Sequence, residues 1–226
     1  PQALKLSESF YPVLGSWLGH HAGTKVSAII GFDNLITEDR LKALGAGAAS
    51  TGSVGLFHIV GQTPEAPTLD AVCLDIQNTQ TLYPTAQEFR LERDRLSHSR
   101  SDELDCIAVG SPHFSYPETI ALLDALQERK SIIPFYVCTN RFVLTKLEHE
   151  KLLIPLKAAG IEIVVDTCIA VAPILKGTGG VMMTNSAKFA HYGPGMTGYV
   201  SVFGSLSDCV ESAITGKIIR DDRLWQ

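Results

Sequence analysis

The sequence lacks any apolar run that approaches the roughly 20 residues needed to cross a bilayer. Its first residues also lack the basic segment and apolar core of a secretory signal peptide. Lysine and arginine form no long run, and the net charge is -5, so the basic surface that binds nucleic-acid phosphates is not expected. We therefore expect a cytoplasmic protein that binds neither membranes nor nucleic acid.

Closely spaced cysteine pairs are also missing. The five cysteines are an odd number, are widely spaced and include no CxxC motif, which argues against a disulfide framework and favours a reducing compartment. A single cysteine is most often a small buried apolar side chain. The glycine run at 177–180 lacks the Lys-Ser/Thr of a phosphate-binding loop, and we predict a turn there.

The composition that remains is that of a globular protein, with 45% hydrophobic and 19% charged residues in a chain of 226. Strand-like apolar runs alternate with helical patterns. The strands are predicted at 25–30, 55–60, 105–110, 133–138, 161–166, 181–184 and 199–203, and the helices at 37–44, 86–98, 115–129, 141–159 and 206–215. This alternation predicts an α/β fold of three layers, α/β/α, with mainly parallel sheets.

The same pattern predicts three parts along the chain. Residues 1–103 form a smaller α/β portion with a long excursion at 63–85, where prolines interrupt the periodicity. Residues 104–219 form a three-layer α/β unit, and residues 220–226 form a polar linker or truncated tail. Because the first residue is not methionine, we expect that the chain was processed or begins inside a longer protein.

Polar residues follow several predicted strands directly. Ligands of open α/β sheets bind beyond the carboxyl ends of the strands, so these residues form the candidate site. They are His58 in the second strand region; Ser111, His113 and Ser115 after the third; Cys138, Asn140 and Arg141 after the fourth; Asp166 and Cys168 after the fifth; and Asn185, Ser186 and Lys188 after the sixth.

Each of these residues has an ordinary alternative role. Small polar residues after a strand most often cap the next helix, which alone would explain Asn140, Asp166 and Asn185. His58 lies in an apolar run, where a core histidine is the commoner case. A helix cap requires neither cysteine, arginine nor lysine, however. The recurrence of these three residue types at successive strand ends therefore favours a functional site at this edge of the sheet.

The residue types indicate a chemistry for this edge. Two thiols at neighbouring strand ends, Cys138 and Cys168, suit an iron–sulfur cluster or a soft metal. Arg141 and Lys188 suit a carboxylate or a phosphate of the substrate. A Lewis-acidic iron beside such a clamp favours elimination of a hydroxyl group.

The motifs that carry these residues resemble the aconitase X family. They are FHIVGQTPEA at 57–66, GSPHFS at 110–115, VCTNR at 137–141, DTC at 166–168, TNSAK at 184–188, FGSL at 203–206, CVE at 209–211 and TGK at 215–217. The resemblance extends from about residue 10 to residue 225. It implies an aconitase-like fold and the dehydration of a small hydroxy acid.

The resemblance also implies a site. It assigns Cys138 and Cys168 as ligands of an iron–sulfur cluster, which we expect to be 2Fe–2S rather than 3Fe–4S or 4Fe–4S. Ser111 stands where many members of the family have cysteine, while Cys73, Cys106 and Cys209 match no ligand motif. The implied substrate-binding residues are His58, Ser111, His113, Ser115, Asn140, Arg141, Asn185, Ser186 and Lys188.

Two partners of the chain are implied in addition: the N-terminal half of the family domain, and a smaller swivelling domain or subunit that supplies a catalytic serine. The resemblance allows two substrates, cis-3-hydroxy-L-proline and mevalonate 5-phosphate, and the form GSPH favours the first. A truncated, non-catalytic fragment and a plain metal- or carboxylate-binding module are the alternatives. Without these partners, we expect the chain purified in air to carry little or no iron and to lack dehydratase turnover.

Overall fold

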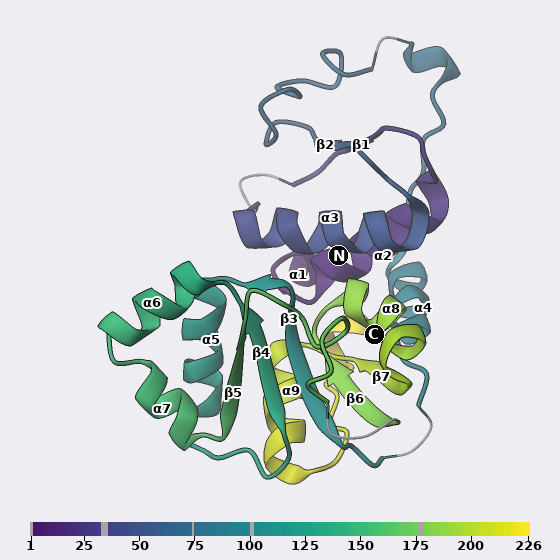
Figure 1. The fold of residues 1–226 in the computed structure, drawn as a ribbon. Helices are drawn as coiled ribbons and strands as arrows, with labels where there is room; N and C mark the ends of the chain where they lie inside the picture. The colour runs from purple at the N-terminus through teal and green to yellow at the C-terminus, as the bar shows by residue number, and fades with distance from the viewer. Residues whose placement is uncertain (1, 33–35, 74, 100–101, 176–178) are drawn as a thin grey trace. The chain divides into compact units, whose positions relative to one another are not determined.

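The computed structural model describes residues 2–32, 36–73, 75–99, 102–175 and 179–226, and it divides the chain into two compact units (Figure 1). The first unit comprises Pro1–Glu92 and Arg223–Gln226, and the second comprises Arg93–Asp222. The division therefore falls after Glu92 rather than at 103, and the end of the tail belongs to the first unit. The predicted turn at 177–180 lies mostly outside the described residues.

The first unit combines helices with a two-stranded parallel sheet. Its elements are α1 (Gln2–Lys5), α2 (Phe10–Ala22), β1 (Ser27–Ile29), α3 (Glu38–Gly52), β2 (Phe57–Ile59), η1 (Ile76–Asn78), α4 (Ala86–Arg95) and η2 (Arg223–Trp225), with the end of α4 reaching into the second unit. Helix α3 begins where the sequence predicts, because the Thr37 hydroxyl accepts a hydrogen bond from the Arg40 backbone N–H. Between β2 and α4 the predicted excursion contains just one short 3-10 helix in its described part.

Helices α2 and α3 pack through glycines. A Cβ placed on Gly15 would lie 2.1 Å from the Leu44 carbonyl oxygen, and one on Gly52 would lie 1.7 Å from that of Gly19. The two backbones are therefore too close for any side chain at these positions. The aromatic side chains of Phe10, Tyr11 and Trp17 are buried around this helix pair.

The second unit is a three-layer α/β structure built on a five-stranded sheet. Its elements are β3 (Cys106–Phe114), α5 (Tyr116–Leu126), β4 (Phe135–Thr139), α6 (Arg141–His149), α7 (Leu153–Ala158), β5 (Ile161–Val165), β6 (Gly180–Thr184), α8 (Ala187–Thr197), β7 (Tyr199–Phe203) and α9 (Leu206–Thr215). The strand order is β5-β4-β3-β6-β7, and every pairing is parallel. The predicted α/β class is confirmed.

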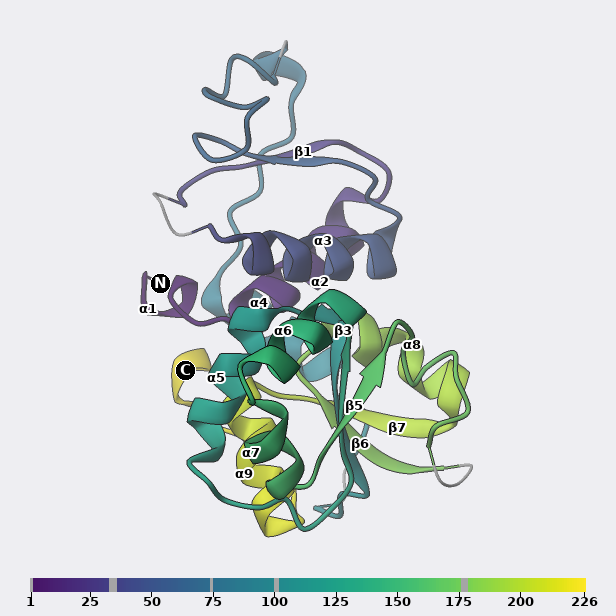
Figure 2. The same cartoon turned by 60° about the vertical axis from the view of Figure 1, so that its left-hand side comes forward.

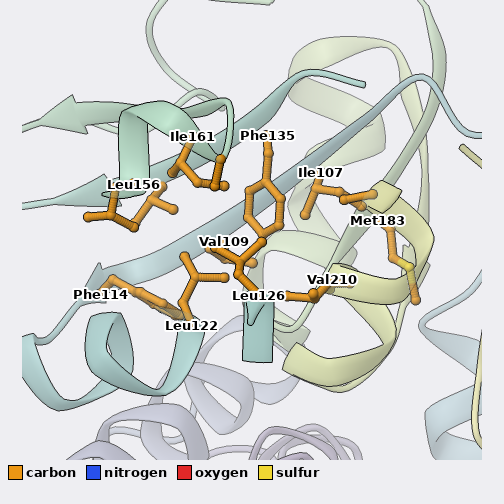
Figure 3. Close-up of a cluster of buried hydrophobic side chains, with 14 of the residues drawn as sticks. Ile107, Val109, Phe114, Leu122, Leu126, Phe135, Leu156, Ile161, Met183 and Val210 are labelled. Carbon is orange, nitrogen blue, oxygen red and sulfur yellow. The ribbon is translucent and has the colours of Figure 1, made fainter. Parts of the chain in front are cut away.

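Helices cover both faces of this sheet (Figure 2). Alternate residues of β3 face opposite sides, so Ile107 and Val109 belong to the core on the side of α5, α6, α7 and α9, while Cys106 and Ala108 lie on the side of α8. The larger core centres on Phe135, which is fully buried between strands and helices (Figure 3). On the opposite face, α8 covers part of the sheet and the turn after β5 covers the rest.

One predicted helix is two helices. The pattern at 141–159 predicts a single helix, whereas α6 ends at His149 and α7 begins at Leu153. Pro155 explains the break, because it cannot donate a hydrogen bond to the carbonyl of Lys151, and its ring clashes with that carbonyl in a continuous helix. Lys151 accordingly adopts a φ of 60°. Proline is tolerated in the first turn of α7, where no intrahelical donor is needed.

The ion pair between Arg129 and Glu211 links the end of α5 to α9. The two guanidinium nitrogens donate to the two carboxylate oxygens at 3.0 and 2.7 Å. The hydrogen bond from Arg129 lowers the pKa of the Glu211 carboxyl group. A carboxyl group whose pKa is lower in the folded state than in the unfolded state stabilises the protein at a pH above its unfolded-state pKa. This stabilisation is lost as the pH falls through the folded-state pKa.

We expect Glu211→Gln to lower the free energy of unfolding by about 0.5 kcal/mol near pH 7, since both partners are more than a third exposed. The difference from the wild type should shrink as the pH falls through the lowered pKa of Glu211 in the folded state, below which the carboxyl group is protonated in both states. Urea unfolding at several pH values measures this. Glu148→Gln, on exposed α6 surface, is the control, and a difference that persists at acid pH would contradict the ion-pair explanation.

Candidate functional site

The candidate site lies at the carboxyl edge of the second unit's sheet. From β3 the chain moves to β4 and β5 on one side, and then returns to β6 and β7 on the other. The strand order thus reverses between β3 and β6. In open α/β sheets, ligands bind in the crevice outside the carboxyl ends of the strands at such a point.

The end of β3 is shaped by Gly110 and the segment that follows it. Gly110 has a φ of 92°, and a Cβ there would lie 2.0 Å from the Cys138 carbonyl oxygen. The Ser111–Pro112 peptide bond is cis, and the pairing of β3 with β4 shifts register between Val109 and Phe114. Residues 111–114 continue β3, whereas the sequence predicts that this strand ends at residue 110.

A hydrogen bond joins the chain on the two sides of the point where the strand order reverses. The Ser186 hydroxyl donates to the backbone carbonyl of Ser111, and it also accepts from the Phe189 backbone N–H as the cap of α8. Ser111 and Ser186 are both buried. The end of β3 and the segment after β6, which lead to helices on opposite faces of the sheet, are thereby joined.

Arg141 and Asp166 form an ion pair across the ends of β4 and β5. The Arg141 Nε donates to Asp166 Oδ2 at 2.6 Å, and the Arg141 backbone N–H donates to Oδ1 at 3.0 Å. The side-chain hydrogen bond from Arg141 is the largest cause that holds the pKa of Asp166 below its usual value. Asn140 is beside this pair and caps α6 by accepting from the Val143 backbone N–H.

His113 extends this group of side chains. Its Nε2 lies 3.2 Å from the Thr167 carbonyl oxygen, to which a ring N–H donates. The charge of His113 also contributes to lowering the pKa of Asp166, after the larger effects of Arg141. The structure therefore brings together Arg141, Asp166 and His113 from three neighbouring strand ends.

Cys138 and Cys168 lie on the α8 face of the sheet, and the electrostatic effect of Cys168 reaches Cys138. Cys138 is buried, and burial raises the pKa of its thiol to about 11, although a hydrogen bond from the Ile169 backbone N–H opposes the rise. The next backbone N–H, that of Ala170, donates to Cys168 Sγ at 3.2 Å. N–H donors beside sulfur stabilise thiolates that ligate a cluster, whereas the burial that raises the pKa of Cys138 disfavours its thiolate form. The role of the two cysteines as cluster ligands stays a prediction.

A full ligand set is not found in the part of the chain that the structure describes. There, no three His, Cys, Asp or Glu side chains converge so that they could hold a metal ion. Cys106 and Cys209 are buried, as expected for cysteines outside a ligand motif. The remaining ligands of a cluster would have to come from elsewhere.

Lys188 and Asn185 lie at the other side of the crevice, near the start of α8. Both are half-buried, and neither makes a side-chain hydrogen bond or ion pair with a described residue. Helix α8 and helix α6, which begins at Arg141, lie on opposite faces of the sheet. The positions of these helices do not favour a clamp formed jointly by Arg141 and Lys188, which stays a prediction.

His58 belongs to the first unit, in β2 beside Ala28 of β1. Its side chain is buried, and its Nδ1 has no hydrogen-bond partner among the described residues. A buried polar atom without a partner is costly, which makes it a candidate for contact with a ligand. The substrate-binding role of His58 stays a prediction.

The structure assigns an ordinary role to part of the predicted site. Ser115, Asn140 and Ser186 each cap a helix through the side-chain oxygen. The sequence places Asp166 among the strand-end residues, with helix capping as its ordinary alternative, but it does not reveal its partner. That partner, Arg141, is 25 positions earlier in the chain.

The fold and its polar carboxyl edge define an open-sheet α/β protein in which the strand order reverses between β3 and β6, the place where ligands of such sheets bind. Two family models match most of the sequence: "Aconitase X second domain" at residues 2–94 and "Aconitase X third domain" at residues 104–215. The chain belongs to the aconitase X family. No described helix has the length and hydrophobicity of a membrane span.

Curated relatives include the cis-3-hydroxy-L-proline dehydratases of Hypocrea jecorina, 35% identical, and of Pseudomonas aeruginosa, 34% identical. The matches cover 95% and 94% of this chain but 37% of each relative. The phosphomevalonate dehydratase large subunit of Methanosarcina mazei is 30% identical over 94% of this chain and 50% of its own length. The crystal structure of Thermococcus kodakaraensis aconitase X in its holo-form matches with a TM-score of 0.78 and 26% identity, over 92% of this chain and 52% of that one.

Proposed function

We propose that this chain forms the substrate-binding edge and part of the cluster site of a dehydratase that acts on cis-3-hydroxy-L-proline. The match of nearly the whole chain to two cis-3-hydroxy-L-proline dehydratases carries the proposal. The chain spans little more than a third of their length, so other parts of the enzyme complete the site. No residue of this chain is proposed as the acid–base group of the reaction.

The charges at the strand ends support this substrate over a phosphorylated one. The charged side chains that follow the strands at the crevice are Arg141, Asp166 and Lys188, and Asp166 already pairs with Arg141. Mevalonate 5-phosphate would bring a phosphate and a carboxylate to this edge, beside an acidic side chain. Free cis-3-hydroxy-L-proline carries one carboxylate and one ammonium group, which a mixed set of charges accommodates.

Each residue has a role in this proposal. Arg141 and Lys188 bind the substrate carboxylate, while Ser111, His113 and Asn185 line the crevice. Cys138 and Cys168 would hold an iron–sulfur cluster together with ligands from outside the described residues. When bound, such a cluster supplies a Lewis acid for the departing hydroxyl group.

A ligand titration tests the proposal. We expect cis-3-hydroxy-L-proline, added to the ¹⁵N-labelled chain, to shift backbone signals at the ends of β3, β4 and β6. Arg141→Gln should weaken this binding by roughly tenfold or more, because the charge-assisted hydrogen bonds from the two terminal guanidinium nitrogens are lost. The same variant should leave the binding of 3-hydroxypyrrolidine, which has no carboxylate, unchanged.

Lys157→Gln is the matched control, since this exposed lysine lies in α7, which leads to the amino end of β5. It should bind like the wild type. Tighter binding of mevalonate 5-phosphate than of cis-3-hydroxy-L-proline would show that the proposed substrate is wrong. Failure of the wild type to bind either compound would favour a non-catalytic fragment.

A further inference from the structure

We infer that Asp166 is a positioning residue, which aims the Arg141 guanidinium group at the substrate carboxylate; this rests on the proposed function. Neither the family match nor the relatives' names assign a role to Asp166. The inference depends on the geometry of the Arg141–Asp166 pair and on the backbone that holds it.

The carboxylate of Asp166 is fixed by its backbone. Asp166 directly follows β5 and adopts a φ of 57°, in the left-handed region that residues other than glycine, asparagine and aspartate rarely visit. Its backbone N–H donates to the Thr139 carbonyl at 2.9 Å, which extends the pairing of β4 with β5 by one step. The left-handed residue ends the strand and leaves the carboxylate within hydrogen-bond distance of the Arg141 backbone N–H at the start of α6.

Both carboxylate oxygens of Asp166 accept hydrogen bonds from Arg141. Oδ1 accepts the backbone N–H of Arg141, and Oδ2 accepts its Nε. The first contact anchors the carboxylate to the start of α6, and the second fixes the guanidinium group relative to it. An arginine held through Nε retains both terminal nitrogens, and no described residue occupies them.

This arrangement prepares Arg141 for a ligand. Its side chain is 74% exposed, so without a partner the long chain would sample many rotamers. Binding a carboxylate would then require ordering it. Because Asp166 already holds Nε, the two terminal nitrogens can face a carboxylate as a fork at a smaller entropic cost.

A double-mutant cycle tests the inference. The affinity of the chain for cis-3-hydroxy-L-proline is measured by NMR titration in the wild type, Asp166→Asn, Arg141→Gln and the double variant. We expect Asp166→Asn to weaken binding about fivefold in the wild-type background, and less than twofold in the Arg141→Gln background. Such non-additivity shows that Asp166 acts through Arg141.

The variants separate positioning from folding. Asparagine tolerates the left-handed conformation, so Asp166→Asn preserves the backbone, and Asp166→Gly preserves it while removing the carboxylate entirely. Both should keep the backbone spectrum of the wild type outside the strand ends. In both, the Arg141 Nε–H signal should move and exchange faster with water.

Two outcomes would overturn the inference without affecting the proposed function. In the first, Asp166→Asn weakens binding equally in both backgrounds. In the second, Arg141→Gln weakens binding but Asp166→Asn does not. Failure of the wild type to bind cis-3-hydroxy-L-proline would instead remove the proposed function, and the inference with it. The Arg141 Nε–H signal would still report whether the ion pair exists.

Discussion

Gly15→Ala is expected to destabilise the first unit by about 3 kcal/mol or more, or to prevent it from folding. The added Cβ would lie 2.1 Å from the carbonyl oxygen of Leu44, a fully buried residue of α3. Backbone cannot move aside as a side-chain end can, so α2 and α3 would have to separate. Overpacking of a tight core costs about 1–3 kcal/mol and sometimes more.

Tryptophan fluorescence during urea unfolding measures the stability of the first unit. The chain has two tryptophans, Trp17 and Trp225, and both are buried in the first unit. The control is Gly45→Ala in α3, where the new Cβ would be 3.5 Å from the Phe57 ring, an ordinary contact. Helix propensity predicts a gain of about 0.5–1 kcal/mol for that change. Equal stabilities of the two variants would contradict the close packing of the helices.

The helix pair also shows what the sequence pattern hides. Helix α2 was not predicted, because ten consecutive residues from Phe10 to Gly19 are buried. A helix buried on all sides has no polar face, so its sequence lacks the period of 3.6 on which the prediction depends. Helix α8 was missed for another reason, since Gly193, Pro194 and Gly195 look like a break although the helix continues through them.

Elements with explicit end signals were predicted well. The box formed by Ser115 and Glu118 caps α5 as expected, and the predicted range of α9 is that of the structure. Local hydrogen bonds decide such boundaries, so neighbouring residues are sufficient to find them. The break before Pro155 was missed, although the proline itself carries the signal.

The candidate site was predicted in outline for a similar reason. Parallel strands place their carboxyl ends at one edge, so polar residues after each strand could be located from the strands alone. The sequence could not tell Arg141, which extends into solvent, from Asn140, which caps a helix. Nor could it find Asp166 as the partner of Arg141, because that contact depends on the pairing of β4 with β5.

The second large effect concerns a buried carboxylate. Glu92 is 2% exposed, and its Oε1 accepts hydrogen bonds from Ser16 Oγ at 2.6 Å and from His20 Nδ1 at 2.9 Å. Ser16 is fully buried, whereas the His20 side chain is 36% exposed. Loss of the carboxylate would therefore leave the buried Ser16 hydroxyl without a hydrogen-bond acceptor, whereas the His20 imidazole could still hydrogen-bond to water.

We expect Glu92→Ala to lower the free energy of unfolding by about 3 kcal/mol, since it leaves a cavity and a buried hydroxyl without its acceptor. Glu88→Ala, one turn earlier in α4, is the control. Glu88 accepts hydrogen bonds from Thr85 at the helix start, and its loss should be less costly because no buried group loses its partner. Unfolding followed by the fluorescence of Trp17 compares the two.

The double variant Ser16→Ala with Glu92→Leu separates the two contributions. Replacing both members of a buried polar pair by apolar groups is less costly than removing one, so this variant should be more stable than Glu92→Ala. The imidazole of His20 keeps access to water and needs no replacement. If Glu92→Ala proves no worse than Glu88→Ala, the buried carboxylate does not hold α4 against α2, and aromatic packing of Phe89 on Trp17 and Phe10 must do so instead.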